Sequence, residues 1–292
     1  MKRVRISSNK FIFFVVIILL AIFAYVVIII LNNYHLNSQR QSNSENIQNI
    51  DYLTAVKAAE IIEISDSRKI VEVPVLMYHH IREYDVADDQ IGTNLSVSAN
   101  NFKEQLDYLK NNSYTTITFS DLIDFPVKKL PDKPVIITLD DGYSDAYENA
   151  FKLLKSNRQI AVFYIISSFI DNPEYLSKEN MVEISDAGME IASHTVTHRN
   201  LTKLAPEDLK KEIINSKIAL EEIVGRKIIS FCYPAGKYDQ IVSKEVINAG
   251  YLTATTTQMA VSNTSEDKFL IPRLRITPSD SITSFANKIN NY

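Results

Sequence analysis

The 292-residue sequence has no tryptophan and only one cysteine, Cys232. A single cysteine excludes an intrachain disulfide, whatever the redox state of the compartment. Cys232 lies inside the apolar run 228–233. We therefore predict that it is a small buried core residue and not a nucleophile.

No acidic residue occurs before Glu45, whereas the first ten residues contain four basic ones: Lys2, Arg3, Arg5 and Lys10. Residues 11–31 follow as one apolar run without charge or proline. A helix needs about 20 such residues to cross a bilayer core. By the positive-inside rule, residues 1–10 are expected in the cytoplasm and the chain after residue 31 outside the cell.

A cleaved signal peptide is the alternative interpretation of residues 11–31. The run is longer than a usual signal-peptide core, and Asn-Asn-Tyr-His at 32–35 is a poor small-residue cleavage site. We therefore expect a single-pass transmembrane anchor and a cell-membrane location, with the main domain extracellular.

No basic block follows the apolar run. Four of the 31 basic residues precede it, which leaves 27 against 35 acidic residues, a net charge of −8 for the outer part. This balance argues against nucleic acid or an anionic lipid surface as a ligand. A neutral or cationic polymer is compatible with it.

The outer part divides into a linker, 32–70, and one domain, 71–292. The linker begins with a stretch rich in Asn, Ser and Gln, typical of a tether. The domain is long enough for a single large core. In it, short apolar runs alternate with longer amphipathic ones, which predicts the α/β class. The predicted strands are 73–78, 114–118, 135–139, 160–166, 189–193, 228–233, 251–255 and 269–276. The predicted helices are 101–111, 145–156, 179–187, 206–224, 241–249 and 281–289.

Continuous apolar runs such as VIITL indicate strands buried on both faces, as in a parallel sheet covered by helices. Polar clusters stand at the carboxyl ends of these strands: His79-His80, Asp140-Asp141, His194 and Tyr233-Pro234. Parallel strands bring all such ends to one face, which is where (β/α) barrels build active sites.

Two of the five histidines, His194 and His198, stand four residues apart after a predicted strand. Together with one carboxylate they would supply the three ligands of a catalytic metal site and leave an open position for water. A second carboxylate could then act as general base. Surface histidines, and an Asx turn at Asp140-Asp141-Gly142, are the plainer alternatives.

Three further features stay open on the residues alone. Periodicity does not choose between His79 and His80, one of which could be a satisfied core histidine. The loop at Tyr233, Pro234 and Ala235 could expose backbone N–H groups as an oxyanion hole, or be an ordinary turn. Arginines in the segment IPRLRI, Arg273 and Arg275, could orient a carboxylate or pair with surface acids.

In this order, TLDDGY, HTVTH and YPAGKYD resemble the polysaccharide deacetylase (NodB-homology, carbohydrate esterase family 4) domain over residues 74–276. The resemblance implies a distorted (β/α) barrel that removes N-acetyl groups from GlcNAc polymers with a divalent metal, commonly zinc. By the family pattern, the metal ligands would be Asp141, His194 and His198. Asp140 would be the general base, and the Ala235 amide would contact the oxyanion.

The sequence departs from the family pattern at three points. Cys232 stands where many members have arginine, the aspartate-tryptophan motif is absent, and no histidine follows His198. However, VLMYHHI and IPRLRI resemble the branch that includes poly-β-1,6-N-acetylglucosamine deacetylases. That resemblance implies that His79 is the general acid and that Arg273 orients Asp140.

The sequence thus predicts a membrane-anchored extracellular metal-dependent N-deacetylase of a GlcNAc-containing surface polymer, poly-β-1,6-GlcNAc or peptidoglycan. A non-catalytic polysaccharide-binding protein on the same fold and an O-acetyl esterase are the alternatives. Two histidines and one aspartate suit Zn²⁺ but admit cobalt, nickel or iron.

Overall fold

Strands and helices alternate along the part of the chain that the computed structural model describes, residues 71–125, 128–264 and 267–291. The strands are β1 (Glu72–Val73), β2 (Val75–Tyr78), β3 (His80–Ile81), β4 (Ser96–Val97), β5 (Thr115–Thr116), β6 (Pro134–Leu139), β7 (Val162–Ile165), β8 (Glu190–Ser193), β9 (Ser230–Cys232), β10 (Thr253–Thr255), β11 (Ser262–Asn263) and β12 (Leu274–Arg275). The α-helices are α2 (Gln90–Leu95), α3 (Ala99–Asn111), α4 (Phe119–Ile123), α5 (Lys152–Asn157), α6 (Lys178–Asp186), α7 (Pro206–Val224), α8 (Gln240–Asn248) and α9 (Ile282–Asn291). Other helical segments are the π-helix η1 (Ala146–Phe151) and the 3₁₀ turns η2 (Ser167–Phe169), η3 (Leu201–Lys203) and η4 (Pro234–Gly236).

The main sheet is parallel and has the order β10-β9-β8-β7-β6-β2-β12, with β5 beside the start of β6. Strand β2, near the start of the described chain, pairs with β6 on one side. On its other side it pairs with β12, the last strand along the chain. A single bridge between Thr255 and Ile271 also joins the segment before β12 to β10, at the other end of the order. The sheet is therefore curled, and this confirms the predicted α/β class with a curled parallel sheet.

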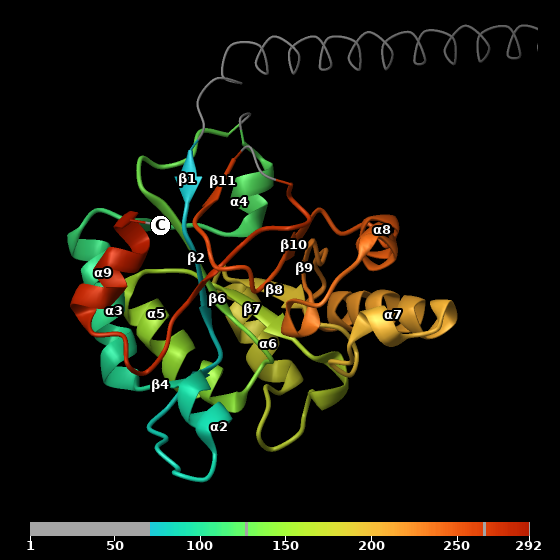
Figure 1. Ribbon diagram of the computed structural model, residues 1–292, viewed down its shortest axis with the longest axis horizontal. Helices are drawn as coiled ribbons and strands as arrows, with labels where there is room; N and C mark the ends of the chain where they lie inside the picture. Colours follow the sequence, from blue (N-terminus) through green and yellow to red (C-terminus); the bar gives the residue numbers. More distant parts are fainter. Residues whose placement is uncertain (1–70, 126–127, 265–266, 292) are drawn as a thin grey trace, which may run out of the picture. The chain divides into compact units, whose positions relative to one another are not determined.

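Alternate residues of each strand enter two separate apolar layers. On β2 and β6, Leu76 and Ile137 belong to the outer layer, which includes side chains of the surrounding helices, such as Phe102 of α3. Val75 and Ile136 belong to the inner layer, inside the curl. Figure 1 shows α3, α5 and α9 on one side of the strands and α7 and α8 on the other. Because both faces are covered, the central strands β2, β6 and β7 are almost entirely apolar, as the continuous runs predicted.

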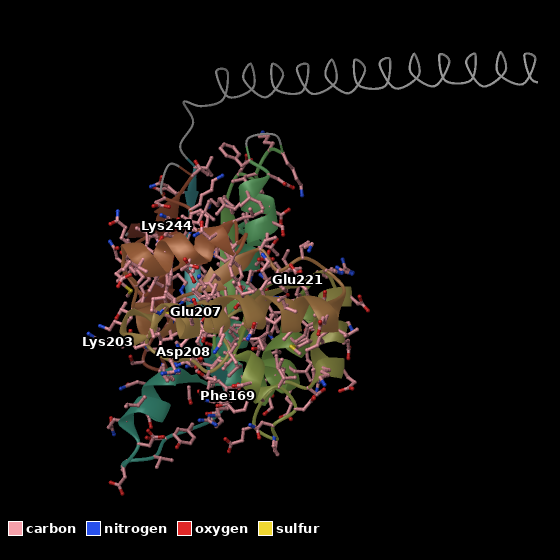
Figure 2. All side chains as sticks on the ribbon, turned by 90° about the vertical axis from the view of Figure 1, so that its right-hand side faces the viewer. Phe169, Lys203, Glu207, Asp208, Glu221 and Lys244 are labelled. Carbon is pink, nitrogen blue, oxygen red and sulfur yellow. The ribbon has the colours of Figure 1, made fainter. Side chains whose placement is uncertain are left out.

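Helix α7 illustrates how the sequence sets the covering helices. Pro206 begins it, where its missing N–H costs nothing, and Glu207 and Asp208 in the first turn complement the helix dipole. Gly225 ends it with a left-handed φ of 65°. Figure 2 labels Glu207 and Asp208 in the first turn of this helix and Glu221 near its other end. The buried face carries Leu209, Ile213 and Leu220.

Prolines account for the main differences from the predicted strands. Pro74 separates β1 from β2, and Pro272 leaves only Leu274–Arg275 and the bridge at Ile271 from the predicted strand 269–276. Proline has no N–H to donate to a strand ladder. The short elements α2, α4, β3, β4 and β11 were not predicted.

The predicted anchor, residues 11–31, and the linker, 32–70, lie outside the described residues. Within the described part of the chain, no helix is long and apolar enough to cross a bilayer. The domain boundaries and the extracellular location stay predictions.

Candidate active site

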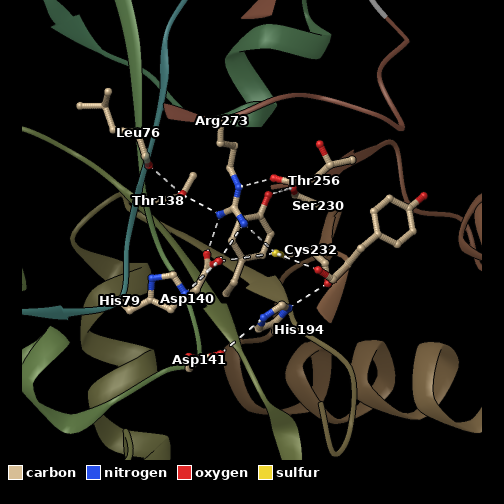
Figure 3. A network of polar contacts seen from close by, with 12 residues as sticks. Leu76, His79, Thr138, Asp140, Asp141, His194, Ser230, Cys232, Thr256 and Arg273 are labelled. Carbon is tan, nitrogen blue, oxygen red and sulfur yellow. Dashed lines mark hydrogen bonds and ion pairs between the residues drawn. The ribbon is translucent and has the colours of Figure 1, made fainter. Parts of the chain in front are cut away.

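Asp140 follows β6 at the carboxyl end of the sheet and is almost completely buried. Both of its carboxylate oxygens accept hydrogen bonds from Arg273, at 2.7 Å to Oδ1 and 2.8 Å to Oδ2. Figure 3 shows this pair between the sheet and the segment that carries Arg273. Burial alone would raise the pKa of Asp140, but the guanidinium outweighs burial and holds that pKa well below its usual range. Asp140 is therefore ionised at any physiological pH.

Arg273 is itself fully buried and held by three more contacts. Its Nη1 donates to Thr138 Oγ1 at 3.0 Å, and its Nε donates to the backbone oxygen of Thr256 at 2.9 Å. Nη2 also lies 3.2 Å from the sulfur of Cys232. The guanidinium therefore has one defined orientation, and it transmits that orientation to the Asp140 carboxylate.

Cys232 is buried, as the sequence predicted, but it lies in this polar network. Its thiol is 3.7 Å from Asp140 Oδ2 as well as 3.2 Å from Arg273. The thiol of Cys232 lies directly beside the guanidinium of Arg273, which comes from the segment before β12. Position 232 thus supplies no arginine to Asp140, and the arginine that does contact this carboxylate is Arg273, directly before β12.

Asp141 points to a different set of groups from those of Asp140. Its Oδ1 lies 3.4 Å from His194 Nε2 and 3.7 Å from His198 Nε2. His194 is buried at the end of β8, whereas the side chain of His198 is 36% exposed. The three predicted ligands therefore converge on one point, open on the His198 side.

Backbone turns with positive φ bring these groups together. Asp141 has φ 73°, and in the loop after β8 Thr195 has φ 70° and His198 has φ 59°. The loop is held by Glu212 of α7, whose carboxylate accepts from the backbone N–H groups of Val196 (3.0 Å) and Thr197 (2.8 Å). A buried charge on a neighbouring helix thus stabilises a conformation that non-glycine residues seldom adopt.

The donor set fits a divalent metal. Nδ1–H of His194 donates to the carbonyl oxygen of Cys232 at 2.8 Å, so Nε2 is the ring nitrogen that faces Asp141 and that a metal would bind in place of a proton. Tetrahedral zinc with ligands at about 2.0–2.2 Å would separate its ligand atoms by roughly 3.3–3.6 Å, close to the distances observed. Burial disfavours a charged His194, yet contacts with Cys232 and the charges of Asp140 and Asp141 raise its pKa to about 10. The pocket therefore attracts a cation.

The structure brings His79, and not His80, to Asp140. His79 Nε2 lies 4.0 Å from Asp140 Oδ2. His80 turns away, with Nδ1 2.6 Å from Asp145 and its ring stacked on Tyr143 at a centroid distance of 3.6 Å. His80 is thus the satisfied histidine of the pair, as strand alternation allowed for one of the two.

The loop after β9 offers a backbone N–H to the site, whereas the side chain of Tyr233 points elsewhere. Ala235 has a left-handed φ of 51°. The amides of Gly236 and Lys237 donate to the carbonyls of Tyr233 and Pro234, while none of the described residues accepts from the Ala235 N–H. The Tyr233 side chain packs in the outer layer next to Phe231, so the structure does not bring its ring to the site.

Sequence reasoning missed Thr138, Thr256, Glu212 and Asp145. Thr138 could have been found, because it is two residues before Asp140 and hence on the same face of β6. Asp145, which also accepts from the Ile81 N–H, gave no signal apart from its closeness to the motif. Thr256 contributes a backbone oxygen and Glu212 lies mid-helix, so neither position carries a readable pattern.

Comparison with known proteins agrees with this geometry. The family model described as polysaccharide deacetylase matches residues 127–254. A polysaccharide deacetylase from Bacillus cereus is 33% identical, covers 76% of this chain and 70% of its own, and superposes with a TM-score of 0.69. The chain is 26% identical to the poly-β-1,6-N-acetyl-D-glucosamine N-deacetylase of Staphylococcus epidermidis over 69% of this chain and 78% of that protein. A deacetylase from Streptococcus pyogenes in complex with acetate, 24% identical, shares the fold with a TM-score of 0.71 over 76% of this chain and all of its own.

The curled parallel sheet, with two aspartates and two histidines at its carboxyl edge, is that of a polysaccharide deacetylase. This chain belongs to the polysaccharide deacetylase family, and the resemblance carried by its motifs is confirmed.

Proposed function

We propose that this protein is a metal-dependent N-deacetylase of a GlcNAc-containing surface polymer, anchored in the membrane with its catalytic domain outside the cell. The observation that carries the chemistry is the convergence of Asp141, His194 and His198 beside the ionised pair of Asp140 and Arg273. The likeness to a poly-β-1,6-N-acetylglucosamine N-deacetylase supports that polymer as substrate. Its anchor rests on the apolar run at residues 11–31.

A divalent metal held by Asp141, His194 and His198 would polarise the acetamide carbonyl and lower the pKa of water. Asp140 then accepts the proton of the attacking water, because Arg273 keeps both its oxygens oriented and unprotonated. The Ala235 N–H, from which no group of the described residues accepts a hydrogen bond, donates to the developing oxyanion.

His79 completes the proton transfer to the leaving nitrogen. Burial lowers its pKa, and Arg273 lowers it further against the pull of Asp140 and Asp141. The neutral imidazole is therefore the starting form. Its Nε2 lies 4.0 Å from Asp140 Oδ2, so a movement of either side chain into hydrogen-bond distance would let it take up the proton that Asp140 has received. His79 then donates that proton to the departing amine.

A purely binding role would not need this set of groups. A binder gains nothing from burying an ionised carboxylate beside a second carboxylate on which two imidazoles converge, since burial of charge costs free energy. The complete Asp140, Asp141, His194 and His198 set therefore supports catalysis.

Acetate release by the purified full chain tests the proposal. We would compare β-1,6-GlcNAc oligomers, chitin oligomers and peptidoglycan, each after chelator treatment and after return of Zn²⁺. The expected result is release from β-1,6-GlcNAc oligomers that chelator abolishes and Zn²⁺ restores. Release from peptidoglycan alone would change the substrate, and release unaffected by chelator would contradict metal dependence.

Two variants separate the assigned roles. Asp140→Asn should lose turnover by at least about 100-fold, the usual worth of a general base, while binding metal normally. His194→Ala should lose metal, measured by elemental analysis after gel filtration. Normal turnover in the first variant, or normal metal content in the second, would remove that residue from its role.

A further inference from the structure

Arg275 lies on the inner side of β12, one layer closer to the carboxyl edge than Arg273. Leu274, between the two arginines, belongs to the outer layer with Ile276. Successive side chains of a strand point to opposite faces, so Arg273 and Arg275 share the inner face. Arg275 pairs in register with Met77, two residues before His79 on the neighbouring strand. The register therefore places Arg275 on the inner face next to the end of β2 that leads to His79, and its charge acts on the His79 imidazole.

The charge of Arg275 has no counter-ion in the described segments 71–125, 128–264 and 267–291. Its backbone is fixed, since its N–H donates to the sulfur of Met259 at 3.4 Å and its carbonyl accepts from Lys288 at 2.9 Å. The Arg275 side chain forms no ion pair within these segments. By contrast, the guanidinium N–H groups of Arg273 all have partners. Burial lowers the pKa of His79, and Arg275 acts in the same direction, which agrees with a guanidinium beside that imidazole. Arg275 is half-buried, so part of its side chain is accessible to solvent.

The orientation of the bound substrate determines which of its groups lies next to Arg275. The acetyl oxygen has to face the Asp141 side and the Ala235 amide, and the leaving nitrogen has to face His79. The sugar ring is bonded to that nitrogen, so it extends over His79 and toward β12. We propose that Arg275 binds an oxygen of the reacting sugar, a hydroxyl or the glycosidic oxygen, and fixes the ring over His79. This inference rests on the proposed N-deacetylase function.

The test compares a substrate with a sugar and one without. Arg275→Met keeps the length of the side chain and removes its donors and charge. A hydrogen bond to a charged group contributes enough that kcat/KM for a β-1,6-GlcNAc oligomer should fall by about 10-fold to 100-fold, mainly through KM. Turnover of 4-nitrophenyl acetate, an acetyl ester without a sugar, should stay within about twofold of the wild-type value. Arg275→Lys, which keeps the charge and loses the fork, should lie between the two on the oligomer.

Each outcome separates this inference from the proposed function. A wild-type chain that releases no acetate from any polymer would end the proposed function and the inference with it. An active wild type with an equally active Arg275→Met variant would overturn the inference alone. So would a fall in kcat at unchanged KM, or an equal loss on oligomer and ester, because either would place Arg275 in the chemistry or the folding. Arg226→Met, which removes an exposed arginine paired with Asp186, is the control and should change neither substrate.

Discussion

Replacing Arg273 by methionine should destabilise the protein and reverse how Asp140 responds to pH. The guanidinium is fully buried and donates two short hydrogen bonds to Asp140. A charge pair about 4 Å apart at an effective dielectric constant of about 20 is worth ~4 kcal/mol. Loss of one partner of a buried pair typically costs about 3–5 kcal/mol, because the other charge remains buried. We expect Arg273→Met to lower the free energy of unfolding by about 3–5 kcal/mol at pH 7.

The sign of the pH effect follows from the two states of Asp140. In the wild type its folded pKa lies below the unfolded value of about 3.9, so the stabilisation is present above that value and is lost as pH falls through the folded pKa. Without Arg273, burial raises the folded pKa above the unfolded one. The carboxyl is then tolerated below about pH 4, and stability is lost as pH rises through the raised value. The variant should therefore be closest to wild type in acid.

Urea unfolding of the full chain with excess Zn²⁺, followed by circular dichroism at pH 5 and pH 7, measures both effects. Asp140→Asn and the double variant Asp140→Asn/Arg273→Met complete the cycle. The double variant should lose much less than the sum of the single variants, since neither charge is left alone. A loss below about 1 kcal/mol for Arg273→Met, or additive losses in the cycle, would refute the reasoning that these side chains form one buried unit.

Three further predictions concern the surroundings of the site. His79→Ala should lower acetate release by about 100-fold or more, and His80→Ala should mainly lower the melting temperature; the opposite ranking in a parallel assay would exchange their roles. Glu212→Gln should weaken metal retention by about 10-fold in competition with a chelator, because it loosens the loop that carries one ligand; unchanged retention would mean that the loop holds itself. Gly236→Ala should lower both stability and activity, since its Cβ would come within 2.1 Å of a threonine oxygen. Gly188→Ala, whose Cβ would have nothing within 4 Å, is the control and should lower the free energy of unfolding by only about 1 kcal/mol. Equal losses of the two variants in thermal melts would count against the close approach at Gly236.

Much of the sheet and its helices could be predicted because both follow a periodic pattern. The predicted helix 206–224 coincides with α7, whose proline and glycine mark both ends. The run 135–139 coincides with β6 apart from one residue. Elements of two to six residues, such as β3 and α2, are too short for a period to emerge. Their conformation depends on contacts with distant parts of the chain, which local sequence does not encode.

The candidate site divides in the same way. Motifs placed Asp140, Asp141, His194 and His198 near one another, and the structure brings them together. Alternation could not separate His79 from His80, since the choice depends on Asp145, 65 residues further along the chain. Glu212 was missed because its role is to accept backbone hydrogen bonds, which leaves no pattern in its own neighbourhood.

The pairing of β2 with β12 has a consequence for the order in which this protein becomes competent. The metal ligands stand between residues 141 and 198, and the groups that position them, Glu212 and the carbonyl of Cys232, are present when the chain has been made as far as residue 232. Arg273, which orients Asp140, arrives 133 residues after its partner and only through the last strand of the described sheet. A chain still emerging from the ribosome could therefore assemble a cation site without an oriented base. Hydrolytic activity would be switched on by the final closing step of folding.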